Sequence, residues 1–327
     1  MVQAHSARSS ILLLQEEMER SVIGQSQVVE RLIIALLANG NVLLEGLPGL
    51  AKTRAVKAMA AVLEARLSRV QFTPDLLPAD ITGTEVYYSN DGRSEFRFEP
   101  GPIFSNLVLA DEINRAPAKV QSALLEAMEE RQVTVSGTTH KMAELFMVLA
   151  TQNPIEQEGT YPLPEAQMDR FLMHISIDYP DAEAELEVIR LVRGESRTNR
   201  PENQKQVVLE QETIFSSRRE IDEIYIAQNV EQYIVDIVTA TRNGANYSDE
   251  LGRWVQVGAS PRGSIGLDKC ARVHAWLKGR ENVTPDDVLE VVHDVLRHRI
   301  MLSYEANAEG VTSDDVIDTI IKLVTIT

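Results

Sequence analysis

A glycine-rich loop, Gly46 to Thr53, joins an apolar run at Val42–Leu44 to the start of a helical pattern. A tight glycine turn exposes consecutive backbone N–H groups to phosphate oxygens, and the helix N-terminus that follows adds its positive dipole. Lys52 would supply a charge to the β- and γ-phosphates, and the Thr53 hydroxyl would ligate Mg²⁺. The usual pattern has a second glycine where Ala51 stands, and one extra methyl is tolerated there if φ is negative. The residues that we expect to contact the nucleotide are Gly46, Leu47, Pro48, Gly49, Leu50, Ala51, Lys52, Thr53 and Arg54.

A second apolar run, Leu107–Ala110, ends in two carboxylates, Asp111 and Glu112. At the carboxyl end of a strand in a parallel sheet, acidic groups reach a ligand bound in the crevice. Asp111 suits a Mg²⁺ ligand, directly or through water, and Glu112 suits the base that orients and polarises an attacking water. Many strands end in solvated acidic residues, so the pair taken alone would not indicate a function. It predicts a catalytic role because the phosphate loop precedes it in the chain.

The apolar run Phe146–Ala150 is followed by Asn153, which would project from the neighbouring strand and hydrogen-bond the attacking water. Asparagine also commonly begins a turn before proline, here Pro154, so a purely structural role is the alternative. The position beside the acidic strand favours the role in catalysis.

Arg170 precedes the apolar run Leu172–Ile177, at the expected edge of the domain. It lies too far along the fold to reach its own nucleotide easily, but it could reach that of a neighbouring copy. An arginine supplied in trans to a phosphoryl transition state accelerates the reaction by roughly 10³–10⁵. A surface ion pair between Asp169 and Arg170 is the alternative.

The elements that must position these residues follow an α/β pattern, in which apolar runs of strand length alternate with helical periodicity. This predicts a doubly wound parallel sheet with strands at Val42–Leu44, Val70–Phe72, Leu107–Ala110, Phe146–Ala150 and Leu172–Ile177, and with helices that include Lys52–Glu64 and Ala118–Glu130. Two stretches alternate with a period of two instead and predict protruding β-hairpins. They are Glu85–Tyr88 with Glu95–Glu99, and Gln132–Val135 with His140–Met142. Aromatic side chains on the first hairpin could grip a client or could equally pack the hairpin down.

The second half is almost wholly helical in pattern, with helices expected at Val230–Arg242, Arg262–Leu277, Pro285–Arg297 and Ser313–Val324. Thr284 is the expected N-cap of the third of these helices, with Asp286 and Asp287 in its first turn. A polar stretch at 194–206 indicates a linker. The sequence therefore predicts an α/β nucleotide-binding domain at 1–193, a linker at 194–206 and a smaller all-α domain at 207–327.

The charge balance argues against nucleic acid as a partner, because 49 Asp and Glu outnumber 32 Lys and Arg and leave a net charge of −17. Duplex binding draws on clustered Lys and Arg, and no such cluster matches this acidic surplus. The one cysteine, Cys270, excludes an intramolecular disulfide and fits a reducing compartment. No apolar run approaches the roughly 20 residues of a bilayer helix, and none has the form of a signal peptide. We expect a cytoplasmic protein with no transmembrane segment.

Seven blocks of this sequence, in this order, resemble the MoxR family of AAA+ ATPases. The blocks are Val22–Gln25, Gly46–Thr53, Gln71–Pro78, Ala110–Ala116, Ala150–Pro154, Glu165–Phe171 and Ala259–Arg262. Together they are far more specific than any one of them, and Ala51 agrees with the family, which commonly has alanine there. The resemblance covers the chain from Val22 to the helix after Arg262.

The resemblance implies roles for individual residues. Val22 and Ile23 would line the adenine pocket for ATP. Lys52 with Thr53 would be the Walker A pair, and Asp111 with Glu112 the Walker B pair. Asn153 would be sensor 1, Arg170 the arginine finger and Arg262 sensor 2, acting either on its own nucleotide or on that of a neighbour. The hairpins would be the helix-2 insert and the pre-sensor-1 hairpin, and the helical second half would be the lid.

The activity that the resemblance implies is Mg²⁺-dependent ATP hydrolysis by a ring-shaped homo-oligomer, expected to be a hexamer. Such rings remodel or mature protein clients through cofactor or metal insertion or complex assembly, and their partners often carry a von Willebrand A domain. Two other classes stay open: a nucleotide-gated binding scaffold with slow hydrolysis, and a helicase-like nucleic-acid motor, which would share the two hairpins. The acidic pair and Arg170 argue against the scaffold, and the net charge of −17 argues against the motor.

Overall fold

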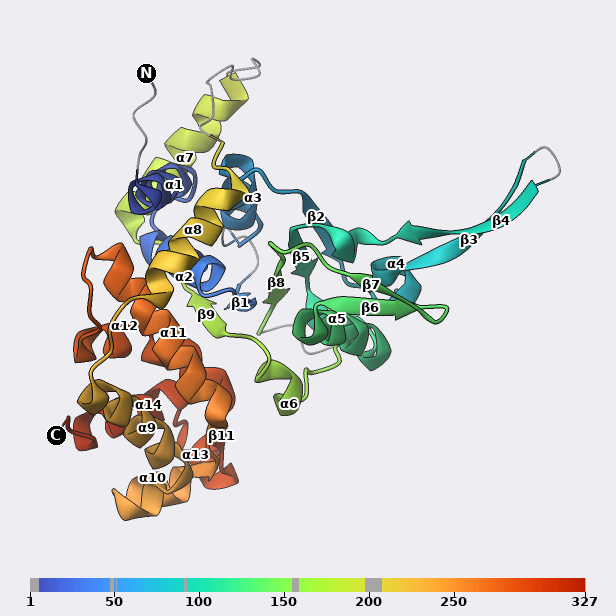
Figure 1. Ribbon diagram of the computed structural model, residues 1–327. Coiled ribbons are helices and arrows are strands. Elements are labelled where there is room, and N and C mark those ends of the chain that lie inside the picture. Colours follow the sequence, from blue (N-terminus) through green and yellow to red (C-terminus); the bar gives the residue numbers. More distant parts are fainter. Residues whose placement is uncertain are drawn as a thin grey trace.

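The centre of the fold is a five-stranded parallel sheet with the strand order β2-β5-β8-β1-β9 (Figure 1). The strands are β1 (Val42–Gly46), β2 (Leu67–Gln71), β5 (Leu107–Asp111), β8 (Met147–Gln152) and β9 (Met173–Ile177). This computed structural model describes residues 6–47, 50, 52–90, 93–154, 159–197 and 208–326. The doubly wound parallel sheet predicted from the sequence is confirmed, with strand ends that differ by at most a few residues.

Helices cover both faces of the sheet, which explains why its strands are apolar throughout. Along β1, Val42 and Leu44 belong to one hydrophobic core, while Leu43 belongs to a second core on the opposite face. The helices of the first core include α1 (Ala7–Ser21), α2 (Ser26–Leu37) and α3 (Lys52–Val62). The second core contains α5 (Ala118–Glu130) and the short α4 (Pro78–Thr82). Shorter elements at the sheet edges are the 3₁₀ turns η1 (Pro102–Phe104) and η2 (Ile113–Arg115) and the helix α6 (Glu165–Met168).

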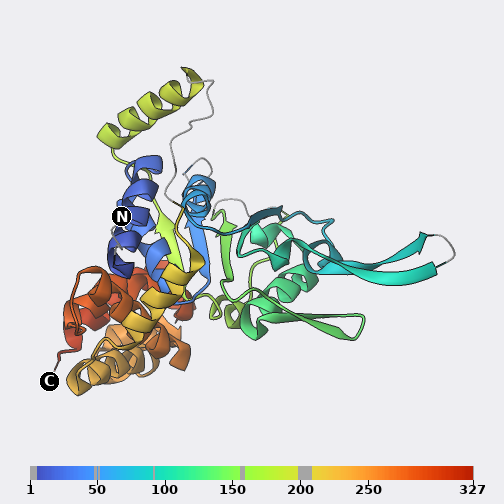
Figure 2. The same cartoon turned by 45° about the horizontal axis from the view of Figure 1, so that its top comes forward.

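Both predicted hairpins are present and protrude from the domain (Figures 1 and 2). The first pairs β3 (Gly83–Asn90) with β4 (Arg93–Pro100) and is longer than the sequence indicated. The second pairs β6 (Gln132–Val135) with β7 (Thr138–Lys141). At the base of the first hairpin, Gly83 has φ +88, and a Cβ there would clash with the carbonyl oxygen of Glu99. Glycine is therefore required where the long hairpin leaves the domain.

The second half is almost wholly helical, as predicted, and packs beside β9 at one end of the sheet (Figure 1). Its helices are α8 (Gln211–Asp222), α9 (Gln228–Arg242), α10 (Asp249–Trp254), α11 (Pro261–Leu277), α12 (Pro285–Leu296), α13 (Tyr304–Glu309) and α14 (Ser313–Leu323). The 3₁₀ turns η3 (Gly244–Asn246) and η4 (Arg297–Arg299) and a small antiparallel ribbon of β10 (Val255–Val257) and β11 (Met301–Leu302) complete it. None of the described helices combines the length and apolar character that crossing a bilayer requires.

The predicted linker at 194–206 overlaps the end of a helix, because α7 (Ala182–Arg197) continues through Gly194 to Arg197. Glutamate and arginine favour a helix, and a single glycine near its end costs only about 1 kcal/mol. Residues 198–206 lie outside the described part of the chain. Directly after them, Leu209 accepts a hydrogen bond of 2.9 Å from the Glu64 N–H and donates one of 2.6 Å to the Val62 carbonyl. The chain thus returns to α3 before α8 begins, and the domain limits at 193 and 207 stay predictions.

A buried ionic contact joins the helical half to the sheet domain. Arg31 of α2 is 2% exposed, and its Nε donates to Asp294 Oδ2 of α12 at 2.8 Å. Its Nη2 donates to the Glu290 carbonyl at 2.6 Å. Because a buried guanidinium without its partners would be very costly, these contacts fix the position of α12 against α2.

Asp287, in the first turn of α12, is fully buried, and three residues surround its carboxylate with polar groups. Its carboxylate accepts hydrogen bonds from the Thr284 N–H at 2.7 Å and from Arg280 Nη1 at 2.6 Å, and His274 Nδ1 lies 2.6 Å away. Burial alone would raise the pKa of Asp287, but hydrogen bonds from His274, Arg280 and Thr284 outweigh it and hold this pKa well below its usual range. Thr284 therefore lies at the helix start that the sequence predicted.

Replacing Asp287 should weaken the fold in a pH-dependent way. We expect Asp287→Asn to lower the free energy of unfolding at pH 7 by about 2–3 kcal/mol, since hydrogen bonds to a charged group are lost. A carboxyl group whose pKa is lowered by folding stabilises the protein above its unfolded pKa of 3.8, and this stabilisation is lost as the pH falls below that value. Urea unfolding between pH 7 and pH 3 measures the effect. The difference from wild type should shrink below pH ~4, whereas the exposed control Asp286→Asn should show little difference at any pH.

Candidate nucleotide site

A cavity of about 500 Å³ lies where the phosphate loop meets the carboxyl ends of β5 and β8. It brings together five residues predicted from the sequence to perform the chemistry. Its lining residues are Leu50, Lys52, Thr53, Arg54, Asp111, Glu112, Thr151, Asn153, Val188 and Val192. The carboxyl ends of parallel strands share one edge of a sheet, which is why positions 52, 111 and 153 meet.

The phosphate loop leaves β1 at Gly46 and enters α3 at Lys52, as the pattern requires. A Cβ on Gly46 would lie 2.6 Å from the Ile177 carbonyl oxygen, so only glycine fits beside β9. Lys52 Nζ donates to the Gly46 carbonyl at 2.6 Å and to the Gln152 carbonyl at 3.3 Å. The ammonium group is thus held at the carboxyl ends of β1 and β8. Of the predicted contact residues, Pro48, Gly49 and Ala51 lie outside the described part of the chain, and Leu47 packs at the margin of the first core.

Arg54 lines the cavity from α3, but its Nε also donates to the Ser21 carbonyl at 2.6 Å. That contact fastens α3 to the end of α1. Arg54 therefore lines the cavity, as predicted, and also contacts the N-terminal helix α1.

Asp111 is nearly buried at the floor of the cavity, and both of its oxygens have partners. Thr151 Oγ1 donates to Oδ1 at 2.6 Å, and Arg69 donates to Oδ2 from Nη2 at 2.6 Å and from Nε at 3.1 Å. Neither Thr151 nor Arg69 was predicted from the sequence. The sequence signal that could have indicated Arg69 was its position on β2, the strand next to β5. In the parallel register of these strands Gln71 is aligned with Asp111, and Arg69 lies two residues before Gln71.

Glu112 stands directly after β5 with a left-handed backbone, φ 57 and ψ 50, which is uncommon for a non-glycine residue. Its N–H donates to Thr151 Oγ1 at 2.9 Å. Its carboxylate accepts a hydrogen bond from Gln71 Nε2 at 2.7 Å and lies 3.0 Å from Arg115 Nε. Strained backbone that the surroundings hold in place is a feature of functional sites. Gln71 is a further contact that sequence reasoning missed.

The residues predicted to hold Mg²⁺, Thr53 and Asp111, line this same cavity. A hydroxyl and a carboxylate are the hard oxygen ligands that Mg²⁺ prefers, and this ion usually takes its other ligands from water and substrate phosphates. Among the described residues, no group of three His, Cys, Asp or Glu side chains could hold a metal unaided. The donor set therefore fits a magnesium ion that arrives with a nucleotide.

Arg170 and Arg262 do not line the cavity and instead meet each other at Glu129, near the end of α5. Arg170 Nη2 lies 3.0 Å from Glu129 Oε2, and Arg262 Nη2 pairs with Glu129 Oε1. The alternative of an ion pair between Asp169 and Arg170 is not what forms, since Asp169 pairs with Arg299 at 2.9 Å and with Arg262 at 3.4 Å. The structure thus gathers both predicted arginines at a place separate from the cavity of the same chain.

Val22 and Ile23 line a second hollow, of about 590 Å³, together with Gly24 and Glu187. Helix α7 borders both hollows, since its Val188 and Val192 line the cavity that contains Lys52. Val22 itself is 2% exposed. The predicted role of Val22 and Ile23 at an adenine ring stays a prediction.

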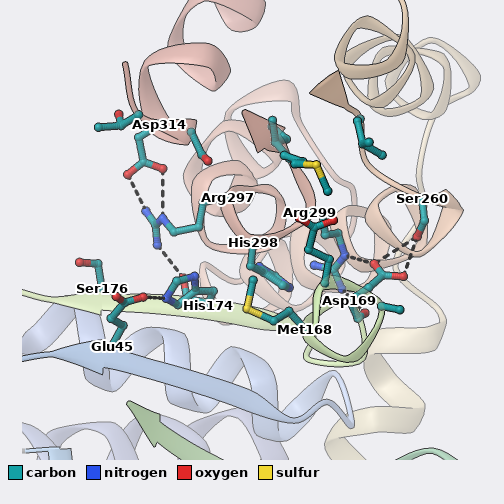
Figure 3. Close-up of a pocket in the computed structure, with 18 of the residues that line it drawn as sticks. Glu45, Met168, Asp169, His174, Ser176, Ser260, Arg297, His298, Arg299 and Asp314 are labelled. Atoms are coloured by element: carbon teal, nitrogen blue, oxygen red, sulfur yellow. Dashed lines mark hydrogen bonds and ion pairs between the residues drawn. The ribbon is translucent and has the colours of Figure 1, made fainter. Parts of the chain in front are cut away.

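A larger cavity, of about 680 Å³, lies between the sheet and the helical half and contains none of the predicted residues (Figure 3). On its floor, His174 Nε2 lies 2.6 Å from Glu45 Oε2, next to the first residue of the phosphate loop. Arg297 Nη1 donates to the His174 carbonyl at 2.6 Å, and its Nε donates to Asp314 at 3.0 Å. Burial and the neighbouring Arg299 hold the pKa of His298 well below its usual range, so this imidazole is neutral. We interpret the cavity as a junction between the two halves, because its two arginines, Arg297 and Arg299, already pair with Asp314 and Asp169.

Comparisons with known proteins agree with this architecture. Residues 41–173 match the family described as "ATPase family associated with various cellular activities (AAA)", and residues 253–320 match the AAA lid domain. The chain is 46% identical over 309 residues to Chaperone MoxR1 of Mycobacterium tuberculosis, covering 94% of this chain and 80% of that protein. It is 34% identical over 321 residues to Protein MoxR of Methylorubrum extorquens, covering 94% and 92%. A crystal structure from Cytophaga hutchinsonii superposes with a TM-score of 0.90 at 46% identity, covering 98% of this chain and 96% of that one.

Proposed function

The chain belongs to the MoxR family of AAA ATPases, and from this premise we propose that it hydrolyses Mg²⁺-ATP as an oligomeric ring and uses the energy to remodel protein clients. It is an ATPase with an AAA domain followed by a helical lid. The observation that carries the proposal is the single cavity in which Lys52, Thr53 and the acidic pair meet.

Five side chains of that cavity have a proposed task. Lys52 stabilises negative charge on the β- and γ-phosphates, as a cation inside a phosphate loop does. Glu112 accepts a proton from the attacking water, and Asn153 holds this water in line. The magnesium ion, when bound by Thr53 and Asp111, supplies further charge neutralisation.

Arg170 and Arg262 complete the site, we propose, from a neighbouring copy. Both lie away from the cavity of their own chain and share one carboxylate, Glu129. The three side chains are 31–45% exposed, and partly exposed ion pairs of this kind are weak, so the arginines can leave Glu129 for a more highly charged phosphate. The ring, expected to have six copies, is what brings them to a neighbouring nucleotide. For Arg262 the pairing with Glu129 favours action in trans over action on its own nucleotide.

The client-binding part of the proposal rests on the first hairpin. Tyr87 and Phe96 are 56% and 70% exposed there, with ring centroids 5.3 Å apart. Phe98 differs, because it stacks on His140 of the second hairpin at 3.9 Å and so packs the two hairpins together. One relative is named a chaperone, which agrees with a protein client. We further expect that the protein is cytoplasmic and that its partners include proteins with a von Willebrand A domain.

A capture experiment tests this role. Glu112→Gln protein loaded with ATP should retain clients, and the same protein with ADP should release them. The matched control carries Tyr87→Ala and Phe96→Ala in addition, and it should lose those proteins while still binding ATP. If the same proteins co-purify in all three cases, the hairpin does not bind clients and the remodelling role is contradicted.

A further inference from the structure

The metal-binding carboxylate of the proposed site already has a cation beside it. Arg69 lies on the edge strand β2, two residues before Gln71, which is in register with Asp111 on β5. From there both Nη2, at 2.6 Å, and Nε, at 3.1 Å, donate to the same oxygen, Asp111 Oδ2. Thr151 holds the other oxygen at 2.6 Å. No oxygen of Asp111 is without a donor.

The two members of this ion pair differ in how far their side chains are exposed to solvent. The Asp111 side chain is 12% exposed, and Thr151 is 1% exposed, so the carboxylate is fixed in the floor of the cavity. The Arg69 side chain is 49% exposed at the sheet edge. A half-exposed arginine contributes little to stability and can swing into water at small cost, whereas the anion cannot move.

We propose that Arg69 is the resident counter-ion of Asp111 and makes retention of the metal depend on nucleotide. A divalent ion on the same carboxylate would lie within about 5 Å of the guanidinium, and the two cations would repel each other. A nucleotide brings several negative phosphate oxygens that offset this repulsion. Without nucleotide Arg69 neutralises Asp111, and the metal is bound weakly. The inference rests on the proposed role of Asp111 as a metal ligand.

The test measures metal binding rather than turnover. Mn²⁺ serves as the probe, because the electron paramagnetic resonance signal of the free ion reports how much is bound. Without nucleotide, Arg69→Gln should bind Mn²⁺ about tenfold more tightly than wild type, which is the size of the repulsion between a divalent ion and a guanidinium about 5 Å apart in water-like surroundings. Arg69→Lys keeps the charge and should stay close to wild type. Arg97→Gln, which removes the same charge from a more exposed arginine on the first hairpin, should leave Mn²⁺ affinity unchanged.

Two further measurements separate the possible failures. With ADP present, wild type and Arg69→Gln should both retain Mn²⁺, and retention by neither would contradict the proposed metal site itself. If ADP-dependent binding is found but wild type, Arg69→Lys and Arg69→Gln have equal affinity without nucleotide, the role of Arg69 is overturned while the proposed function stands.

Asp111→Asn combined with Arg69→Gln should abolish the gain in Mn²⁺ affinity. Should Arg69→Gln melt early, Arg69→Met replaces it, with the same expected gain.

Discussion

Glu112→Gln should reduce ATP turnover by about 10²–10⁴-fold, the usual contribution of a positioned general base, while ATP affinity stays that of wild type. The amide has nearly the shape of the carboxylate, and it can keep a hydrogen bond with Gln71, whose Nε2 lies 2.7 Å from Glu112 Oε2. It cannot accept a proton from water at neutral pH. Steady-state hydrolysis gives the first quantity and equilibrium binding of ATP gives the second.

The matched control for Glu112 is Glu126→Gln, an exposed acid on α5 outside the cavity. It removes the same charge from the chain, and turnover should not change. Wild-type turnover in Glu112→Gln would remove Glu112 from the mechanism. Loss of ATP affinity in that variant would instead assign Glu112 to binding.

Arg170→Ala should lower turnover by about 10³-fold in the assembled protein, because an arginine supplied to the transition state contributes at least that much. The loss should be absent at dilutions where only monomers remain, since a lone chain keeps Arg170 at Glu129. Hydrolysis per copy is measured against protein concentration, with the mass of the assembly followed by light scattering. Arg219→Ala, a 65% exposed arginine far along the chain, is the control.

Mixing two inactive variants tests the same idea without dilution. Arg170→Ala keeps an intact cavity, and Lys52→Ala keeps an intact arginine. Mixed rings should therefore recover part of the wild-type turnover, because some intact cavities receive Arg170 from the neighbouring copy. A mixture that is no more active than its components, or a wild-type rate per copy that does not change on dilution to monomer, would contradict action in trans.

The strands and most helices could be predicted because their patterns are local. α5 has the same limits, Ala118–Glu130, in sequence and structure, since its apolar residues recur at helical spacing between clear ends. The convergence of Lys52, Asp111 and Asn153 was also predictable, because a parallel sheet brings the carboxyl ends of its strands to one edge. The start of the linker was not, since polar composition alone does not distinguish the last turn of α7 from coil.

The partners of the site residues could not be predicted, because they depend on long-range side-chain geometry. Arg69 and Gln71 alternate along β2 as polar residues do on any edge strand, and only the register with β5 directs them to the acidic pair. Glu129 likewise resembles any solvated acid at a helix end, and nothing local indicates that two arginines meet there. Such contacts set the electrostatics of the site, and they exist only where the fold brings side chains from distant parts of the chain together.

The most direct test of the account is a calorimetric titration of the wild-type chain with Mg²⁺-ATP, alongside Lys52→Ala. We predict saturable heat with one site per copy and a dissociation constant between about 1 μM and 1 mM, as for typical enzyme substrates, and a strong loss of affinity in Lys52→Ala. Absence of any heat of binding at millimolar Mg²⁺-ATP, or an equal affinity in the two proteins, would contradict the assignment of the cavity around Lys52 as the nucleotide site.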